Sequence, residues 1–149
     1  MNIVGKWKVV QVKGRDEADN IVWLNEEEYK AFLIRSGYPE ERMAERMSIF
    51  GQKIIFTEDN LVEILIQIPE GISQEEIDAA VASGDAKIVD GMMAMCSSDP
   101  DDAMKWKEED GKFFSSEGFD LETNEMSWAK IDVVDDNSMD FMLFRIVRE

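Results

Sequence analysis

The chain has 149 residues, with 33 acidic and 16 basic side chains, no histidine, one cysteine and a formal net charge of −17. A chain of this length forms one domain that buries roughly 68–70% of its unfolded surface, and its 44% hydrophobic content supplies the core. Residues 1–149 are therefore expected to be a single domain. The lack of histidine excludes imidazole-based zinc sites and catalytic triads. The surplus of acids disfavours nucleic acids and anionic lipids as partners.

Three features of the sequence concern the cellular location of the protein and metal binding: the start of the chain, its longest apolar runs and its cysteine. The sequence shows neither a basic segment followed by an apolar stretch nor an apolar run near the ~20 residues of a membrane helix. We expect a cytoplasmic protein without membrane insertion. Cys96 has no second cysteine for a disulfide. Met92, Met93 and Met95 beside it are soft ligands of the kind that Cu(I) takes. Methionines on one strand are more often simply buried, so no metal or cofactor is predicted.

The first fifty residues are predicted to form two strands and a helical hairpin. Apolar residues alternate over Gly5–Val12, and a short apolar run follows at Ile21–Leu24. Asn25 can cap the free N–H groups of a helix that has acids in its first turn. Pro39 suits the first turn of a second helix, which Gly51 ends.

From Gln52 onward the hydrophobic period changes to two, which predicts strands. Lys53–Thr57 and Leu61–Ile68 form a hairpin, and a capping-box sequence at Ser73 opens a third helix that ends at Gly84. The remaining predicted strands are Lys87–Val89, Met92–Ser97, Met104–Lys107, Lys112–Ser116, Phe119–Glu122, Met126–Val134 and Met139–Val147.

The short connections set the expected topology. Strands that follow one another through tight turns pair antiparallel, because a parallel crossover needs a dozen or more residues. A sheet of this size commonly closes into a barrel, which removes its unpaired edges. The expected fold class is mainly β: an antiparallel up-and-down β-barrel of about 8–10 strands with a helical hairpin after the first strand and one further short helix.

A resemblance to a known family begins at Gly5-Lys6-Trp7. Lipocalins and intracellular fatty-acid-binding proteins, both of the calycin group, open with a Gly-x-Trp on the first strand. The order of one strand, two short helices and a run of antiparallel strands resembles the fatty-acid-binding branch, in which the helix pair covers the barrel mouth. The resemblance implies a lipocalin-like, calycin-type barrel whose floor is closed by Trp7 beneath a last-strand cation, Arg145 or Arg148.

Arg145 is the first candidate for ligand binding. In the fatty-acid-binding branch an Arg-x-Tyr on the last strand holds a carboxylate, and the chain resembles this motif at Arg145, with Val147 at the tyrosine position. Three interpretations stay open: floor closure or another internal ion pair, a solvent-facing strand position, or an anion anchor in the cavity. Strand alternation places Phe141 on the face of Arg145, so both are candidate ligand-binding residues.

Aromatic and methionine side chains of the helix pair are further candidates. Phe32, Met43 and Met47 belong to an apolar stripe at helical spacing, and flexible thioethers make an adaptable wall over an apolar ligand. The alternative is that this stripe is the core face of the helices. Acids cluster as well: between Ile54 and Met104 there are twelve acids and a single lysine, a pattern typical of a solvated face.

These observations predict non-enzymatic binding of a small hydrophobic or amphiphilic ligand in a barrel cavity, with no cofactor. Removal of apolar area from water supplies the driving force, at about 25 cal/mol per Å². The candidate ligand-binding residues are Arg145, Phe32, Met43, Met47 and Phe141. The alternative is a protein-interaction module with a solid barrel and an acidic recognition surface. An enzyme is not expected, because no nucleophile, phosphate-binding or paired-carboxylate motif stands out.

Overall fold

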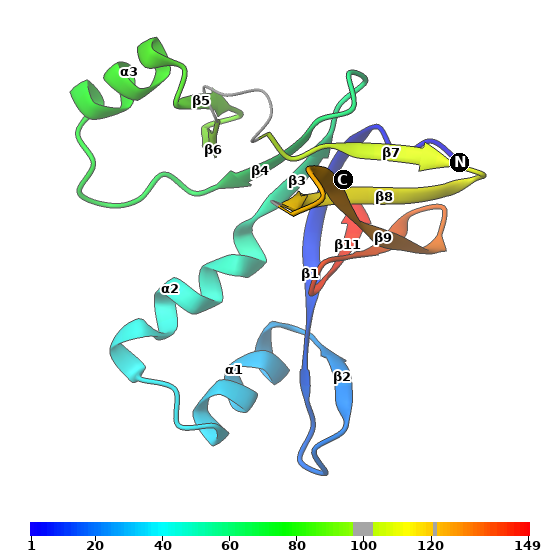
Figure 1. Ribbon diagram of the computed structural model, residues 1–149. Coiled ribbons are helices and arrows are strands. Elements are labelled where there is room, and N and C mark those ends of the chain that lie inside the picture. Colours follow the sequence, from blue (N-terminus) through cyan, green and yellow to red (C-terminus); the bar gives the residue numbers. More distant parts are fainter. Residues whose placement is uncertain (97–102, 121) are drawn as a thin grey trace.

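The computed structural model describes residues 1–96, 103–120 and 122–149 (Figure 1). Eleven strands in this part of the chain belong to one sheet. They are β1 (Gly5–Arg15), β2 (Ile21–Leu24), β3 (Lys53–Phe56), β4 (Val62–Ile66), β5 (Ala86–Val89), β6 (Met92–Met95), β7 (Trp106–Glu109), β8 (Lys112–Asp120), β9 (Glu125–Asp135), β10 (Ser138–Phe141) and β11 (Phe144–Arg148). The α-helices are α1 (Glu26–Arg35), α2 (Met43–Met47) and α3 (Gln74–Ser83), and the 3-10 helices η1 (Glu40–Arg42) and η2 (Ser48–Gly51) flank α2.

The strand pairings are antiparallel, as the short connections predict. Neighbouring strands follow the order β5-β6-β4-β3-β1-β11-β10-β9-β8-β7, and β2 pairs with the far end of β1. The sheet curls, and α1 and α2 lie beside the β1–β2 hairpin at one end of the molecule (Figure 1). The predicted mainly β class, with a helical hairpin after the early strands and one further helix, is confirmed.

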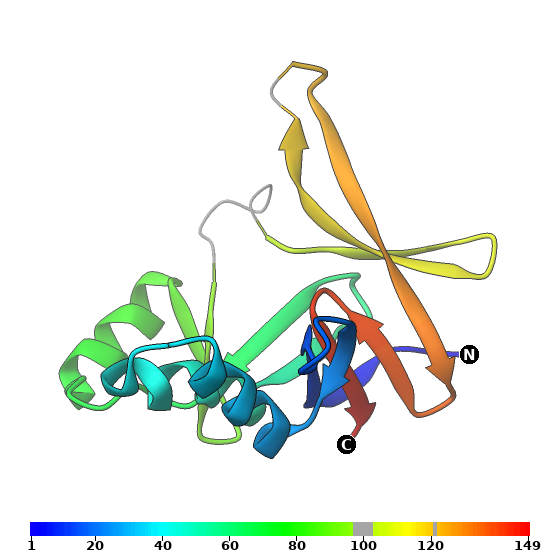
Figure 2. The same ribbon diagram turned by 90° about the horizontal axis from the view of Figure 1, so that it is seen from below.

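A short bridge brings the two arms of the curled sheet together. Leu61, just before β4, pairs antiparallel with Lys105, just before β7. Beside this bridge the backbone N–H of Trp106 donates to the carbonyl of Asn60 at 3.0 Å. The eight strands that run from β4 through β3, β1, β11, β10, β9 and β8 to β7 thereby surround one interior. Beyond the bridge, β8 and β9 continue as a hairpin that projects away from the rest of the sheet (Figure 2).

The interior is occupied by the chain's own side chains. Phe56 of β3 is fully buried, and three rings meet it edge-on at centroid distances of 5.6 to 6.5 Å, those of Trp7, Trp106 and Phe141. Edge-to-face pairs of this kind add about 0.5–1.5 kcal/mol each beyond the burial of their area. The aliphatic side chains around these rings are also closed to solvent; they include Ile54, Met139 and Ile146.

Trp7 joins the two ends of the chain. Its indole N–H donates to the carbonyl of Ile3 at 3.0 Å, and the guanidinium carbon of Arg148 lies 4.4 Å from its ring centroid. Arg148 also donates to the carbonyl of Asn2 at 2.7 Å. This is the expected contact between Trp7 and a last-strand cation, and Arg148 makes it, whereas Arg145 lies elsewhere.

The helix ends match the signals in the sequence. The Asn25 side chain accepts from the N–H of Glu28 at 2.9 Å, and the Glu28 carboxylate accepts from the N–H of Asn25 at 3.0 Å, which completes a capping box. The Ser73 hydroxyl accepts from the N–H of Glu76 at the start of α3. Gly84 ends α3 in the left-handed conformation that glycine adopts without steric cost.

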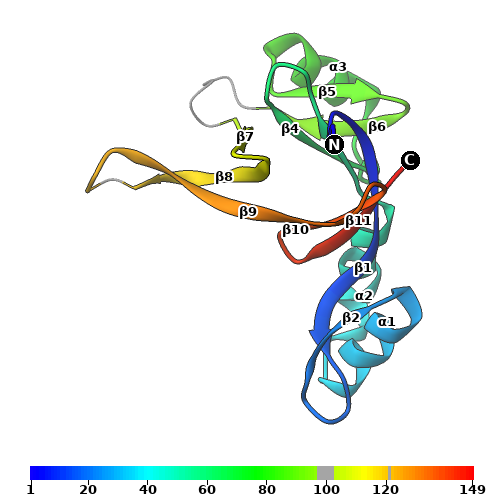
Figure 3. The same ribbon diagram turned by 90° about the vertical axis from the view of Figure 1, so that its right-hand side faces the viewer.

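The segment between β4 and β7 contains a second, smaller core. β5 and β6 extend the sheet beyond β4, and α3 packs against β5, at the opposite end of the molecule from α1 and α2 (Figure 3). Leu65 of β4 is buried with Met92 and Ala94 of β6. β4 has buried residues on both of its faces, since Val62 belongs to the main core and Leu65, three residues on, belongs to this second core.

The last predicted strand, Met139–Val147, is two strands. β10 and β11 form a hairpin around Met142 and Leu143, and Met142 adopts a left-handed φ of 56°. Turn residues such as Asn-Gly are missing there, so a continuous apolar run conceals the turn. The turn interrupts the alternation that predicts a shared face for Phe141 and Arg145. Phe141 is buried in the interior, whereas Arg145 is partly exposed.

Other element boundaries also differ from the predictions. β1 continues to Arg15 because β2 pairs with its far end. The second predicted helix, from Pro39 to Gly51, is a short α-helix between two 3-10 helices. Phe119 belongs to β8, so the separate strand expected at Phe119–Glu122 is wrong; residue 121 lies outside the described residues. The end of the expected Met92–Ser97 strand also lies outside them, as do the three acids at positions 99, 101 and 102.

Removal of the Arg148 guanidinium is expected to destabilise the fold. Arg148→Met keeps an apolar side chain over Trp7 but loses the cation–π contact and the hydrogen bond to Asn2, so we expect a loss of about 1–3 kcal/mol in the free energy of unfolding. Urea titration followed by tryptophan fluorescence measures it. The control is Arg42→Met, which removes an exposed arginine; equal stability of the two variants would contradict the role of Arg148.

An aspartate stabilises the tip of the β1–β2 hairpin. The carboxylate of Asp16 accepts from the backbone N–H groups of Ala18 at 3.0 Å and Asn20 at 2.9 Å. The hydrogen bond from Asn20 lowers the pKa of Asp16 below its ordinary value, and the bond from Ala18 adds to the effect. A lowered pKa in the folded state means that the ionised form stabilises the fold above about pH 4 and that this contribution disappears as the pH falls through the folded pKa.

Asp16→Asn is therefore expected to lower the Tm at pH 7 and to lower it less at pH 2.5, because the contribution of the ionised wild-type carboxylate is lost as the pH falls. Thermal unfolding at the two pH values measures the difference. The matched control is Asp136→Asn, which makes the same change in net charge at an exposed position. A Tm difference for Asp16→Asn that is the same at both pH values would show that the charge of Asp16 is irrelevant.

Candidate functional site

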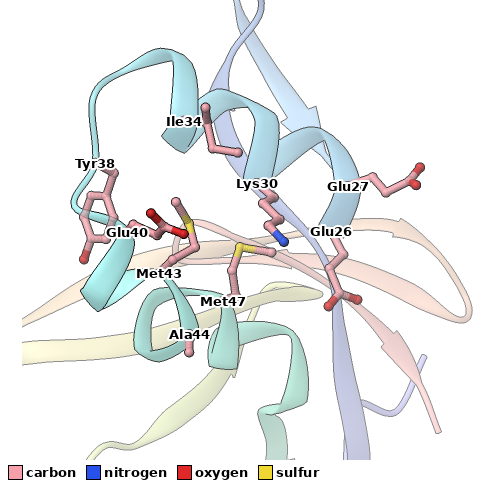
Figure 4. A pocket seen from close by; sticks show the side chains of 9 residues that line it. All are labelled: Glu26, Glu27, Lys30, Ile34, Tyr38, Glu40, Met43, Ala44 and Met47. Atoms are coloured by element: carbon pink, nitrogen blue, oxygen red, sulfur yellow. The ribbon is translucent and has the colours of Figure 1, made fainter.

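A groove of about 800 Å³ lies between α1 and α2 (Figure 4). Its lining comes from α1, from the connection to η1 and from α2: Glu26, Glu27, Lys30, Ile34, Tyr38, Glu40, Met43, Ala44 and Met47. Figure 4 shows the side chains of Met43 and Met47 extending from α2 toward α1, and Lys30 extending from α1 toward Met47. The groove is thus formed by the facing sides of the predicted helical hairpin.

Helical spacing separates the groove face of α1 from its core face. Glu26, Lys30 and Ile34 follow one another at intervals of four and line the groove. Tyr29 and Leu33, at the same interval, are 2% and 5% exposed and belong to the core. One stripe of α1 therefore faces the core, and the next stripe faces α2.

The groove has an apolar floor that is only partly covered. Tyr38, Met43 and Met47 are half-buried and pack against the main core. Ile34 is 62% exposed. These side chains form a contiguous, partly exposed apolar patch. Such patches mark binding sites more often than single exposed apolar residues do.

Charged groups at the groove are mostly acidic. Glu26, Glu27 and Glu40 contribute three carboxylates, and Lys30 contributes the single ammonium group. Within the part of the chain that the structure describes, none of the four takes part in an ion pair. An apolar floor with an acidic surround favours a ligand that carries an apolar body and a positive charge.

The five predicted ligand-binding residues do not form one site. Met43 and Met47 line the groove. Phe32 lies on another face of α1, where a Cβ on Gly14 would lie 3.5 Å from its ring. Phe141 is 0% exposed in the barrel interior. Arg145 lies on β11, outside the groove.

Arg145 has protein partners of its own. Its guanidinium donates to both carboxylate oxygens of Asp140 on β10, at 2.7 and 3.1 Å, and lies 4.7 Å from the ring centroid of Trp23 on β2. The hydrogen bonds that Arg145 donates to Asp140 raise the pKa of Arg145 above its ordinary value, so the side chain stays cationic. Ile146, its neighbour on β11, is buried in the interior, which places Arg145 on the outer face of the sheet. Of the three interpretations, the solvent-facing strand position fits this geometry, and the partner Asp140 lies on the same outer face.

Sequence reasoning missed part of the groove. Ile34 and Tyr38 are apolar, but they carry no motif, and their exposure depends on how α2 packs. The acids at positions 26 and 27 are visible in the sequence as favourable first-turn residues, so their second role as groove lining becomes apparent only when α2 lies opposite them.

Searches for other kinds of site gave negative results for the described residues. No group of three or more Asp, Glu and Cys side chains in residues 1–96, 103–120 and 122–149 is arranged to hold a metal ion. The helices in the same ranges are too short and too polar to cross a membrane. Comparisons of the chain with family models, with curated proteins and with solved structures gave no match.

The stability contribution of Phe141 distinguishes an interior filled by side chains from an interior that holds a ligand cavity. Phe141→Ala is expected to lower the free energy of unfolding of the ligand-free protein by about 3–5 kcal/mol, because it removes a ring from a closed core and leaves a cavity. Chemical denaturation measures the change. Leu143→Ala, at a position that is 58% exposed on the adjacent turn, is the control and should lie within about 0.5 kcal/mol of wild type. A loss below about 1 kcal/mol for Phe141→Ala would indicate a loosely filled interior.

Proposed function

We propose that this protein is a non-enzymatic binding protein and that its ligand is a small amphiphile with a cationic head group. The proposed site is the groove between α1 and α2. The observation that carries the proposal is the combination, in one groove, of an apolar floor formed by Tyr38, Met43 and Met47 and three carboxylates that have no described ion-pair partner.

The size and flexibility of the groove suit a small ligand. Its volume of about 800 Å³ falls within the range of about 300–1,000 Å³ that small-molecule sites occupy. Methionine side chains change rotamer at low cost, so Met43 and Met47 can adapt to alkyl chains of different shape. Burial of the alkyl chain against this floor contributes about 25 cal/mol per Å² before ordering costs.

Charge selects the head group. Three carboxylates against one ammonium group surround the floor, and the net charge of −17 raises the local concentration of cations around the whole molecule. Like-charge repulsion penalises a ligand carboxylate near Glu26, Glu27 and Glu40, whereas an ammonium head group is attracted by the same three side chains. This supports a cationic ligand over a fatty acid.

The proposed site differs from the barrel cavity expected from the sequence. Phe56, Trp7 and Phe141 occupy the interior and are closed to solvent. A ligand there would have to displace packed rings at several kcal/mol each. The groove offers comparable apolar contacts with no such displacement.

A protein-interaction module with an acidic recognition surface is the second candidate. The solid interior supports it, because the barrel then serves as a scaffold for its surface. Acids exceed bases by 33 to 16, and most of the described acids are exposed. Such a module attracts a basic partner through exposed charges, and the attraction is screened over about 8–10 Å at physiological salt. Association that weakens steeply with added salt is its signature.

The groove is tested by filling it. Ala44 is an exposed lining residue, and Ala44→Trp places a large ring in the groove without removing a core side chain. We expect dodecyltrimethylammonium, below its micelle concentration, to shift the methyl NMR signals of Met43 and Met47 in the wild type. The Trp variant should bind at least about tenfold more weakly, a loss of about 1.4 kcal/mol.

Matched comparisons make this test specific. Ala79→Trp makes the same change at an exposed position of α3 and should bind like the wild type. Dodecyl sulfate should bind more weakly than the cationic amphiphile, and tetramethylammonium, which lacks the alkyl chain, should not shift the two methyl groups. Equal binding of the cationic and anionic amphiphiles, or binding that Ala44→Trp leaves unchanged, would rule out the proposed site.

A further inference from the structure

A second pocket lies on another face of the helix pair, between α1, α2 and the β1–β2 hairpin. Its volume is about 260 Å³, and its lining includes three basic residues, Lys13, Arg15 and Arg46, together with Tyr29 and Phe32. No acidic residue of the described part of the chain lines it. The chain as a whole has 33 acids and 16 bases and is strongly negative. The lining of this pocket, with three cations, has the opposite charge.

Arg46 and Tyr29 form a fixed pair of polar groups in this pocket. The Nε–H of Arg46 donates to the hydroxyl oxygen of Tyr29 at 2.9 Å. Tyr29 is 2% exposed, and its ring lies against those of Phe32 and Phe50 at centroid distances of 6.0 and 5.8 Å. The buried tyrosine therefore holds the guanidinium of an otherwise exposed arginine in one orientation.

Several hydrogen-bond donors of Arg46 and Tyr29 have no acceptor among the described residues. Among the described residues, the hydroxyl proton of Tyr29 has no acceptor, and the terminal nitrogens of Arg46 make no hydrogen bond or ion pair. A tyrosine that accepts from arginine can still donate its own proton. The pair therefore presents one O–H and the terminal N–H groups of a guanidinium, and a carboxylate is the group that pairs with such a fork.

The other two cations have different roles. The ammonium of Lys13 lies 5.5 Å from the ring centroid of Trp23. Arg15 donates to the carbonyl of Asp19 at 2.9 Å. The head groups of both residues are engaged elsewhere, and the carboxylate of Asp19, 3.7 Å from Arg15, offsets the charge of that arginine. Arg46 is therefore the residue that contacts the anion.

We propose that this pocket binds a small monocarboxylate, with Arg46 and Tyr29 as donors to the carboxylate and Phe32 as the apolar wall for its carbon skeleton. The volume of about 260 Å³ is smaller than that of most drug-sized sites, which limits the ligand to a small acid. The planar guanidinium matches two carboxylate oxygens, and an aromatic wall favours an acid with an apolar body over sulfate or chloride. This site is separate from the groove between α1 and α2 and takes a ligand of opposite charge.

Benzoate is the probe for this site, observed through the side-chain Nε–H signal of Arg46 and the backbone signal of Gly14 in NMR titrations. We expect both signals to shift with benzoate and to remain in place with benzamide, which has the same shape without the charge. Arg46→Met should weaken benzoate binding at least about tenfold, and Tyr29→Phe, which removes only the hydroxyl, should weaken it about threefold to tenfold.

Controls separate this site from the general charge of the molecule. Arg42→Met removes an exposed arginine four residues before Arg46, outside the pocket, and should bind benzoate like the wild type. Arg46→Met should leave the binding of dodecyltrimethylammonium to the groove unchanged, so the two sites are tested independently. Equal binding of benzoate and benzamide, equal losses for the Arg42 and Arg46 variants, or the absence of any shift at Arg46 would overturn the proposal.

Discussion

The aromatic contacts of Phe56 connect the strands that enclose the interior of the sheet. Its ring receives Trp7 from β1, Trp106 from β7 and Phe141 from β10, all edge-on within 6.5 Å. These strands lie far apart in the chain, so one buried ring holds together the beginning, the middle and the end of the sequence. The bridge at Leu61 and Lys105 brings β4 and β7 into place beside it. Because close-packed interiors tolerate little change in volume, this arrangement leaves the barrel interior to the protein's own side chains.

Because the interior is filled, both proposed binding sites lie on the surface, on two faces of the helix pair. One face of α1 and α2 carries an apolar groove with three carboxylates. Another face carries a small pocket with three cations and a buried tyrosine. The two faces follow from helical spacing, since residues 26, 30 and 34 of α1 point one way and residues 29 and 32 point another. A short amphipathic hairpin thus carries the two proposed sites, which differ in charge and do not involve the barrel interior.

The contact between Trp7 and Arg148 is relevant to the resemblance to calycins. A first-strand tryptophan beneath a last-strand cation is what that resemblance implies, and the structure contains such a pair. The comparisons with known proteins neither support nor oppose the assignment, so it stays a prediction that rests on Gly5-Lys6-Trp7 and on the order of the elements. The outer-face position of Arg145, in a bidentate pair with Asp140, removes the one residue that pointed to a fatty-acid carboxylate.

The sequence predicts the local elements: the capping box of Asn25 and Glu28, the start and end of α3, and the antiparallel pairing that short turns require. These depend on residues within a few positions of one another. It did not determine the turn at Met142 and Leu143, because both residues are apolar and only pairing of β10 with β11 favours the turn over a longer strand. Nor did it distinguish groove from core among Phe32, Met43 and Met47, since all three have the same helical spacing. Contacts between segments that are distant in the chain decide which face of the helix pair meets the barrel. They also decide whether Phe141 fills the interior or lines a cavity, and these contacts exist only in the tertiary structure.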